Sequence, residues 1–215
     1  MKQYRTIVVD PPWEYGVEFP STSTHKSNDN RRLTKWTSKP LPYKGMDLEA
    51  IRALPVKSLA EPSGATLFLW TTNRYLPDAF DVLDAWGAKY RQTVVWAKPP
   101  GSRPGFCAAI APNCAEYLLV AKFGGGEARL KTWSTNVIVA PRGAHSAKPE
   151  VFMDLIEQVS PGPYIELFAR RAKMGWDCWG NEAPGSIVWP GMDSLTEPGV
   201  HSGQVDPLGV EEDGE

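Results

Sequence analysis

The feature that most constrains this fold is a series of short apolar runs separated by segments with helical spacing. Residues 6–9 (TIVV) and 65–70 (ATLFLW) have the length and continuous apolar character of buried strands. Such strands alternating with helices are typical of an α/β protein, with helices on both faces of a central sheet. Further strands are predicted at 89–98, 115–123, 135–140 and 163–170, and helices at 46–54, 76–86 and 149–160.

Several charged residues stand at the ends of these predicted strands. Ligands of α/β sheets bind in the crevice beyond the carboxyl ends of the strands, so residues at strand ends are expected to converge on one cleft. The residues at predicted strand ends are Asp10, Lys98, Lys122, Arg142 and Arg170. We interpret Lys98 as an exposed strand end rather than a catalytic residue.

The first strand ends abruptly in Asp10-Pro11-Pro12-Trp13. The two prolines lack backbone N–H groups, which leaves the Pro11 carbonyl free to accept a hydrogen bond beside the Asp10 carboxylate. Two adjacent acceptors suit one –NH₂ group, and Trp13 adds a flat face on which a base can stack. The motif therefore favours an exocyclic amine of adenine or cytosine, although a strand end with a core tryptophan explains the same four residues.

Charge is distributed unevenly along the chain. From Asp177 onward there are nine acidic residues and no Lys or Arg, which leaves 23 basic against 16 acidic residues in 1–176. Residues 16–45 are polar, turn-rich and basic, and they directly follow the Asp10 motif. We expect this segment to contact nucleic acid, with affinity that falls as salt rises. The candidate phosphate contacts are Lys26, Arg31, Arg32 and Lys35.

Composition argues against several other classes of protein. No apolar run approaches the roughly 20 residues that a membrane span needs, and the N-terminus does not resemble a signal peptide. The three cysteines and three histidines lack metal-ligand spacing, so we expect no metal and a reducing, cytoplasmic environment. Of the nine tryptophans, Trp70, Trp86 and Trp96 are predicted to be core, while Trp36 and Trp133 are candidates for stacking bases.

Many motifs in order resemble one family. Beyond DPPW, the segments LFLWTTN (67–73), TVVWAKPP (93–100), HSAKPE (145–150), IELFAR (165–170) and WGNE (179–182) follow the pattern of the MT-A70 family of S-adenosylmethionine-dependent adenine methyltransferases. The resemblance covers roughly residues 4–182 and implies a Rossmann-like fold with a mostly parallel sheet. It divides the chain into a catalytic domain, 1–183, and an acidic, Gly/Pro-rich flexible tail, 184–215.

The resemblance also implies roles for individual residues. Asp10 and Pro11 should bind the target amine, with Pro12 and Trp13 completing the catalytic motif and Tyr43 on the substrate side. Asp10 also borders the cofactor. The other implied S-adenosylmethionine contacts are Lys122, Arg142, His145, Ser146, Glu166, Phe168, Asn181 and Glu182. Read without the family, Phe168 is equally compatible with a core position.

Three functions remain open at this point. We expect methylation of the exocyclic N6 amine of adenine in DNA, in the cytoplasm of a bacterial host or a phage-infected cell. RNA adenosine is the alternative substrate, and a non-catalytic nucleic-acid-binding subunit of the same fold is the alternative class. The family is compatible with a homodimer or a heterodimer, and the recognition sequence is not readable from the chain.

Overall fold

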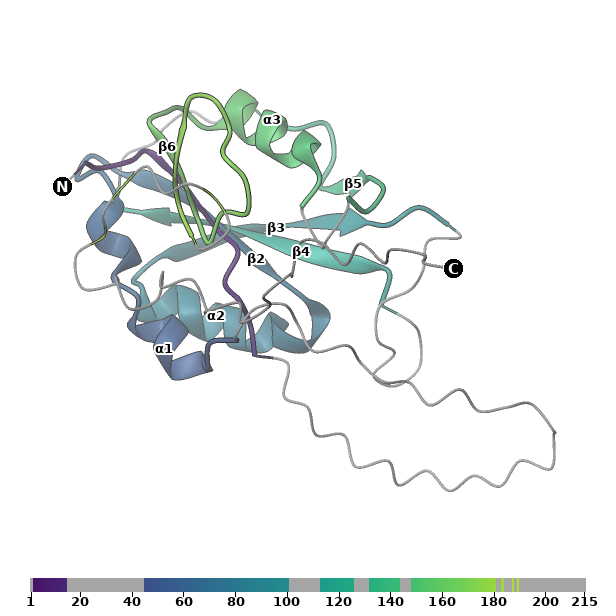
Figure 1. The fold of residues 1–215 in the computed structure, drawn as a ribbon, viewed down its shortest axis with the longest axis horizontal. Coiled ribbons are helices and arrows are strands. Elements are labelled where there is room, and N and C mark those ends of the chain that lie inside the picture. Colours follow the sequence, from purple (N-terminus) through teal and green to yellow (C-terminus); the bar gives the residue numbers. More distant parts are fainter. Residues whose placement is uncertain are drawn as a thin grey trace, which may run out of the picture.

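Strand β1 (Thr6–Val9) lies inside a mixed sheet, and all four of its residues are buried. The computed structural model describes residues 2–14, 45–100, 113–125, 132–143, 148–180, 183, 187 and 189. Within that part the sheet has seven strands in the order β5-β3-β4-β2-β1-β6-β7 (Figure 1). The other strands are β2 (Ala65–Thr71), β3 (Lys89–Ala97), β4 (Ala115–Phe123), β5 (Val137–Val139), β6 (Tyr164–Leu167) and β7 (Trp176–Trp179).

Strand direction decides which residues meet at each edge of the sheet. Strand β1 is parallel to both β2 and β6, with Val9 opposite Leu69 on one side and Leu167 on the other. Strand β4 is antiparallel to β2 and to β3. The beginning of β4 therefore lies at the same edge as the carboxyl ends of β1, β2 and β3. The sheet is otherwise parallel, which agrees with the predicted α/β, Rossmann-like class.

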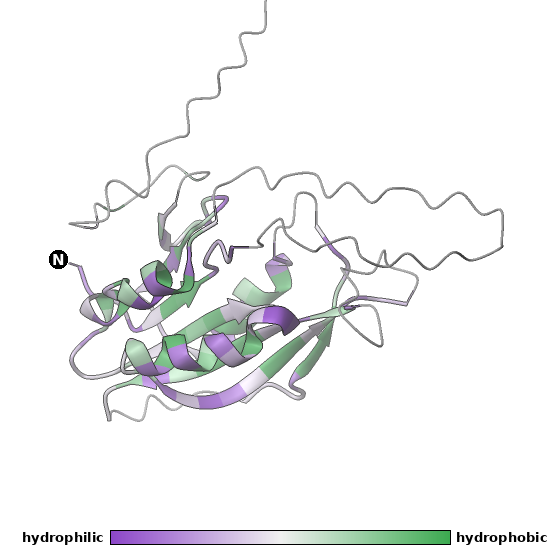
Figure 2. Ribbon diagram, turned by 90° about the horizontal axis from the view of Figure 1, so that it is seen from below, coloured by the Kyte–Doolittle hydropathy of each residue, from purple (hydrophilic) through white to green (hydrophobic). Residues whose placement is uncertain are grey.

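Helices cover both faces of the sheet (Figure 1). On one face, α1 (Leu48–Ala53) and α2 (Leu76–Ala85) pack on a core that includes Ile7, Leu67 and Trp86. On the other, α3 (Glu150–Val159) packs on a core that includes Phe68 and Trp96. Figure 2 shows the reason: the central strands are mainly hydrophobic, whereas the helices carry hydrophilic residues on their outer sides. Short 3₁₀ helices occupy Val56–Leu59 and Asn73–Tyr75.

Most predicted elements are confirmed, with ends shifted by a few residues. Asp47 caps α1, and its carboxylate accepts a 2.7 Å hydrogen bond from the Ala50 N–H. Pro149 is the residue before α3 rather than its first residue. The last predicted strand stops at Leu167 instead of continuing to Arg170, and β7 was not predicted.

Two residues beyond the predicted domain boundary pack on the core. Trp189 belongs to the assigned flexible tail, yet it is fully buried and packs edge-on against Trp179 with ring centroids 5.1 Å apart. Ile187 packs against the same core. The packed core thus includes residues beyond position 183, because a buried tryptophan contributes a large apolar surface to it. No helix in the described ranges is long and apolar enough to cross a membrane.

Candidate active site

Asp10 emerges at the point where the carboxyl ends of the central strands meet. It directly follows β1, and its backbone N–H donates to the Leu167 carbonyl at 3.4 Å. Across the sheet, Trp96 at the end of β3 is opposite Glu116 near the beginning of β4. The antiparallel course of β4 thus brings the Glu116 carboxylate to the same edge as Asp10.

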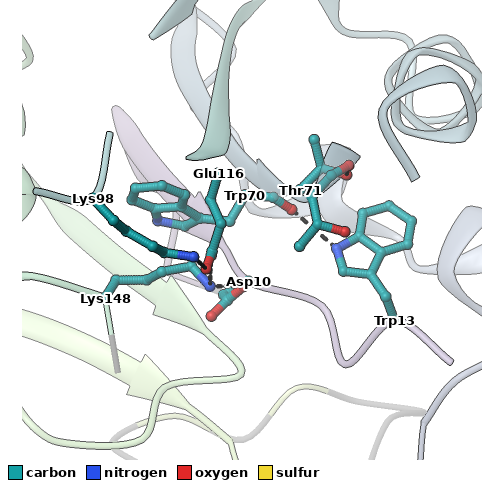
Figure 3. Close-up of polar contacts among 8 residues, drawn as sticks. Asp10, Trp13, Trp70, Thr71, Lys98, Glu116 and Lys148 are labelled. Carbon is teal, nitrogen blue, oxygen red and sulfur yellow. Dashed lines mark hydrogen bonds and ion pairs between the residues drawn. The ribbon is translucent and has the colours of Figure 1, made fainter. Parts of the chain in front are cut away.

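Four side chains form an alternating chain of charges at this edge (Figure 3). Lys98 Nζ lies 2.9 Å from Glu116 Oε1, and Glu116 Oε2 lies 3.2 Å from Lys148 Nζ. Lys148 Nζ in turn lies 3.0 Å from Asp10 Oδ1. The side chains are only 3% to 18% exposed, so the ion pairs are poorly screened by water. We call Lys98, Glu116, Lys148 and Asp10 the charge chain.

The ionisation of the charge chain follows from this pairing. Burial opposes charge on Glu116, but Lys148 and Lys98 together hold the pKa of its carboxyl below the usual range. Burial also opposes charge on Lys148, yet Asp10 and Glu116 raise the pKa of its ammonium above the usual range. The Lys148 ammonium additionally lies 5.2 Å from the centre of the Trp70 ring. Lys148 is therefore a fixed positive charge beside Asp10.

Glu166 has the opposite electrostatic environment. It lies on β6 opposite Val8, one strand away from Asp10. Burial and the negative charge of Asp10 raise the pKa of its carboxyl to about 7, and the attraction of Arg171 and Lys148 only partly offsets this. Its carboxyl forms no hydrogen bond or ion pair to another residue of the described ranges. A cationic or hydroxyl-bearing ligand at this edge would satisfy it.

Trp13 lies on the other face of the sheet from the charge chain (Figure 3). Its Nε1–H donates to the Trp70 carbonyl at 3.1 Å, and its ring stacks on Tyr75 at 5.2 Å between centroids. Only 4% of Trp13 is exposed. The structure thus contradicts the prediction that Trp13 offers a face to the base, because the ring is already used to anchor the motif in the α1/α2 core.

The carbonyl groups of Pro11 and Pro12 both accept a backbone hydrogen bond. The Pro11 carbonyl was predicted to be free, but it accepts a 2.8 Å hydrogen bond from the Trp13 N–H. One of its two lone pairs remains for a further donor. The Pro12 carbonyl accepts the Met46 N–H at 2.8 Å, which ties the motif to the segment before α1. The backbone of the motif is therefore fixed on both sides.

Two lysines lie where the sequence analysis did not place them. Lys122 was expected beside the cofactor, but it is opposite Thr66 at the beginning of β2, the far edge of the sheet from Asp10. The expectation is wrong because β4 is antiparallel to β2, so the carboxyl end of β4 lies at the edge of the sheet opposite to Asp10. Lys98 was interpreted as an exposed strand end, yet it is buried and paired with Glu116.

Phe168 turns the chain away from the sheet next to Asp10. It directly follows Leu167, the partner of Val9, and its φ of 61° is unusual for a residue with a side chain. Its ring lies edge-on to Trp179, 5.2 Å between centroids, and is partly buried. A Cβ on Gly180 would lie 2.6 Å from the Ala169 carbonyl oxygen, so the turn requires glycine there.

The roles assigned to several other residues stay predictions. Arg142 is exposed after β5, and the structure shows no contact between it and Asp10. Trp70, Trp86 and Trp96 are confirmed as core, and Trp133 donates its Nε1–H to the Leu155 carbonyl. Outside the described residues lie Lys26, Arg31, Arg32, Lys35, Trp36, Tyr43, His145, Ser146, Asn181 and Glu182.

Sequence reasoning missed two members of the charge chain, Lys148 and Glu116. Lys148 lies within the HSAKPE segment, and the following Pro149 restricts its backbone to extended conformations, which is a readable local signal. Glu116 opens an apolar strand, and its relevance depends on the direction of β4. No group of three or more potential metal ligands occurs within the described ranges.

These features define an α/β protein in which two lysines pair with two carboxylates at the carboxyl edge of the sheet. The model of the MT-A70 family matches residues 4–182, which spans the whole sheet and the charge chain. The chain belongs to the MT-A70 family and is a methyltransferase by that membership.

Named relatives cover this chain to different extents. It is 31% identical to the type II methyltransferase M.MunI of Mycoplasma sp over 87% of this chain and 81% of the relative. It is 28% identical to the human N(6)-adenine-specific methyltransferase METTL4, over 84% of this chain and 38% of that protein. For the human N(6)-adenosine-methyltransferase catalytic subunit METTL3 the identity is 26%, over 85% of this chain and 29% of that protein.

Proposed function

We propose that this protein transfers a methyl group from S-adenosylmethionine to the exocyclic N6 amine of adenine in DNA. The observation that carries the proposal is the placement of Asp10, whose carboxylate lies at the carboxyl edge of the sheet with a buried ammonium 3.0 Å from one oxygen. The ion pair with Lys148 fixes the orientation of this carboxylate, which is what a positioned acceptor needs.

Asp10 and the Pro11 carbonyl bind the target amine. Lys148 occupies Oδ1 of Asp10, so Oδ2 accepts one amine hydrogen, and the remaining lone pair of Pro11 accepts the other. Engaging both N–H bonds draws the nitrogen lone pair out of conjugation with the ring and aims it for attack. Asp10 is not required to be a strong base, because a methylated amine becomes acidic and loses its proton late.

The residues around Asp10 fit S-adenosylmethionine. Glu166 is a half-buried carboxyl without a polar side-chain partner among the described residues, and it suits the hydroxyls or the positive charge of that cofactor. Lys148 suits its carboxylate, and Phe168 lines the turn beside Asp10. The bound cofactor supplies an electrophilic methyl group. Arg142, His145, Ser146, Asn181 and Glu182 are proposed as further contacts, whereas Lys122 is not, because of its place at the far edge.

DNA is the proposed polymer because similarity extends over most of a type II methyltransferase but under two fifths of METTL4 and METTL3. The target adenine would leave the helix, at a cost of a few kcal/mol unless it is already single-stranded. Lys26, Arg31, Arg32 and Lys35 are proposed to contact phosphates, and Tyr43 the base. In view of its burial, Trp13 is proposed to support the motif rather than the base.

The test is transfer of a labelled methyl group to adenine-containing DNA and RNA of matching sequence. We expect label on the adenine amine of DNA, and loss of at least about 100-fold in rate in Asp10→Asn, which keeps the shape but removes the charge. Asp84→Asn, an exposed change on α2, is the matched control. Label on RNA alone would make the protein an RNA methyltransferase.

A non-catalytic subunit is distinguished by cofactor binding. S-adenosylmethionine at 100 times its dissociation constant should stabilise the folded protein by about 2.7 kcal/mol. A folded protein that shows neither this shift nor any transfer would contradict the proposed enzyme.

A further inference from the structure

Arg171 connects the loop after β6 to the backbone of Lys148. Its Nη1 lies 2.9 Å from Glu150 Oε1 in the first turn of α3, and its Nη2 donates to the Lys148 carbonyl at 3.3 Å. One guanidinium therefore joins two neighbouring groups at the beginning of α3. The planar fork of arginine makes two such contacts at once, which a lysine ammonium reproduces less well.

Lys148 is the member of the charge chain that Arg171 contacts. Its side chain reaches Asp10 and Glu116, while its carbonyl is held by Arg171 and its ψ is restricted by Pro149. A shift of its backbone would move Nζ relative to the Asp10 carboxylate. Errors of about 1 Å in the placement of reacting groups cost up to about 100-fold in rate.

Stability alone gives a weak reason for the Arg171 contacts. The side chains of Arg171 and Glu150 are 46% and 75% exposed. Ion pairs between exposed side chains contribute about 0–1 kcal/mol to folding. Loss of Arg171 should therefore leave the protein folded. A large effect on transfer would come from the position of Lys148 or from the lost attraction of Arg171 for Glu166, and the accessibility of Lys148 separates the two.

We infer that Arg171 is a positioning residue that holds Lys148 against Asp10, and that it acts through the Lys148 carbonyl and Glu150. The inference rests on the proposed function of Asp10. It adds to the site a residue that touches neither Asp10 nor the reacting groups.

The same loop provides a matched control. Lys173 Nζ lies 2.7 Å from Asp154 Oδ1 and 3.5 Å from Glu157 Oε1, further along α3. Lys173 thus ties the loop to the same helix through exposed ion pairs but has no contact with Lys148. Lys173→Ala removes a comparable link without touching the beginning of α3.

The first measurement compares steady-state transfer to DNA by Arg171→Ala, Arg171→Lys and Lys173→Ala. We expect Arg171→Ala to lower kcat about tenfold with little change in KM for DNA, and Arg171→Lys to recover part of it. Lys173→Ala should stay within about twofold of the unmodified chain, because the start of α3 is intact. Equal kcat in the two alanine variants would overturn the inference.

The second measurement does not depend on activity. Brief acetylation with acetic anhydride, read by peptide mass spectrometry, reports how accessible and how well paired the Lys148 amine is. We expect Lys148 to be acetylated several-fold faster in Arg171→Ala and at an unchanged rate in Lys173→Ala. Unchanged acetylation in both variants would overturn the inference even where transfer is found. Absence of transfer by the unmodified chain would contradict the proposed function, and the acetylation rates would still decide the role of Arg171.

Discussion

At the carboxyl end of β2, one face of the sheet carries charged side chains and the other carries aromatic rings, and both faces contact the Asp10 motif. On the α3 side the charge chain surrounds Asp10, and on the α1/α2 side Trp13 stacks on Tyr75. Trp70 belongs to both, because its ring lies beneath Lys148 while its carbonyl accepts the Trp13 Nε1–H. The comparison teaches that one side orients the carboxylate of Asp10 and the other fixes the backbone of its motif.

The two half-buried glutamates of the site, Glu116 and Glu166, show a second contrast. Two lysines lower the pKa of Glu116, whereas burial and the neighbouring Asp10 raise that of Glu166 to about 7. Glu116 is therefore paired within the charge chain, whereas Glu166 has no ion pair or hydrogen bond to the side chains of the described residues. We assign the first carboxyl to the scaffold of the site and propose the second as a ligand contact.

The strongest test of the aromatic side is Trp13→Ala. Removing this buried ring should cost about 3–5 kcal/mol of unfolding free energy in urea. Trp86→Ala is the matched control, because Trp86 is also buried and donates its Nε1–H to a carbonyl at 3.1 Å, that of Ile51. At a temperature where both variants are folded, transfer should fall in Trp13→Ala alone. Equal transfer in the two variants would separate Trp13 from the placement of Asp10.

On the charged side, Glu116→Gln leaves two buried ammonium groups with one carboxylate. We expect a loss of about 3 kcal/mol in unfolding free energy, because an unpaired buried charge is strongly unfavourable. Lys98→Met in the same chain should restore part of that loss, since Lys98 is the more buried lysine. A double variant no more stable than Glu116→Gln would show that Lys98 does not depend on Glu116.

The pH dependence of stability tests Glu166. Its folded pKa of about 7 lies above the value of 4.5 for an unperturbed carboxyl, so the folded state binds the extra proton. The contribution is fully present below about pH 4.5 and is lost as pH rises through 7, a change on the order of 2–3 kcal/mol. Thermal unfolding of the ligand-free protein from pH 5 to 8 measures it. Glu166→Gln should flatten this decline, and Glu49→Gln, an exposed change on α1, should not.

The smallest expected effect belongs to Tyr75→Phe. The Tyr75 hydroxyl donates to the Glu14 carbonyl, directly after the motif, while its ring stacks on Trp13. Losing this exposed hydrogen bond should cost about 1 kcal/mol or less and leave the stacking in place. Transfer should remain near normal, and a large loss of transfer would assign Tyr75 a direct part in the site.

Local sequence patterns predicted most of the sheet because buried strands and amphipathic helices have distinct periodicities. They also predicted that Asp10 ends a buried strand, since the prolines stop the ladder. They did not predict β7, a four-residue strand in which only Asp177 is half-buried and the other three residues are buried. The equally short β1 was recognised because all four of its residues are β-branched, and β7 has no β-branched residue.

The site was predictable in part, and the errors share one physical cause. The order of motifs identified the family and the role proposed for Asp10, without reference to strand direction. An apolar run such as residues 115–123 looks the same whichever way it runs, so its direction had to come from the fold. That direction brought Glu116 to the site and took Lys122 away from it.

The sequence by itself determined the α/β class, the end of β1 at Asp10 and the membership of a methyltransferase family. Only the tertiary structure decided that Lys148 pairs with Asp10, that Lys98 is buried, and that Trp13 and Trp189 belong to the core. Local patterns report the burial of a segment, whereas ion pairs and ring contacts join residues that are distant in the chain. Those partners are selected by packing, and packing exists only in the folded molecule.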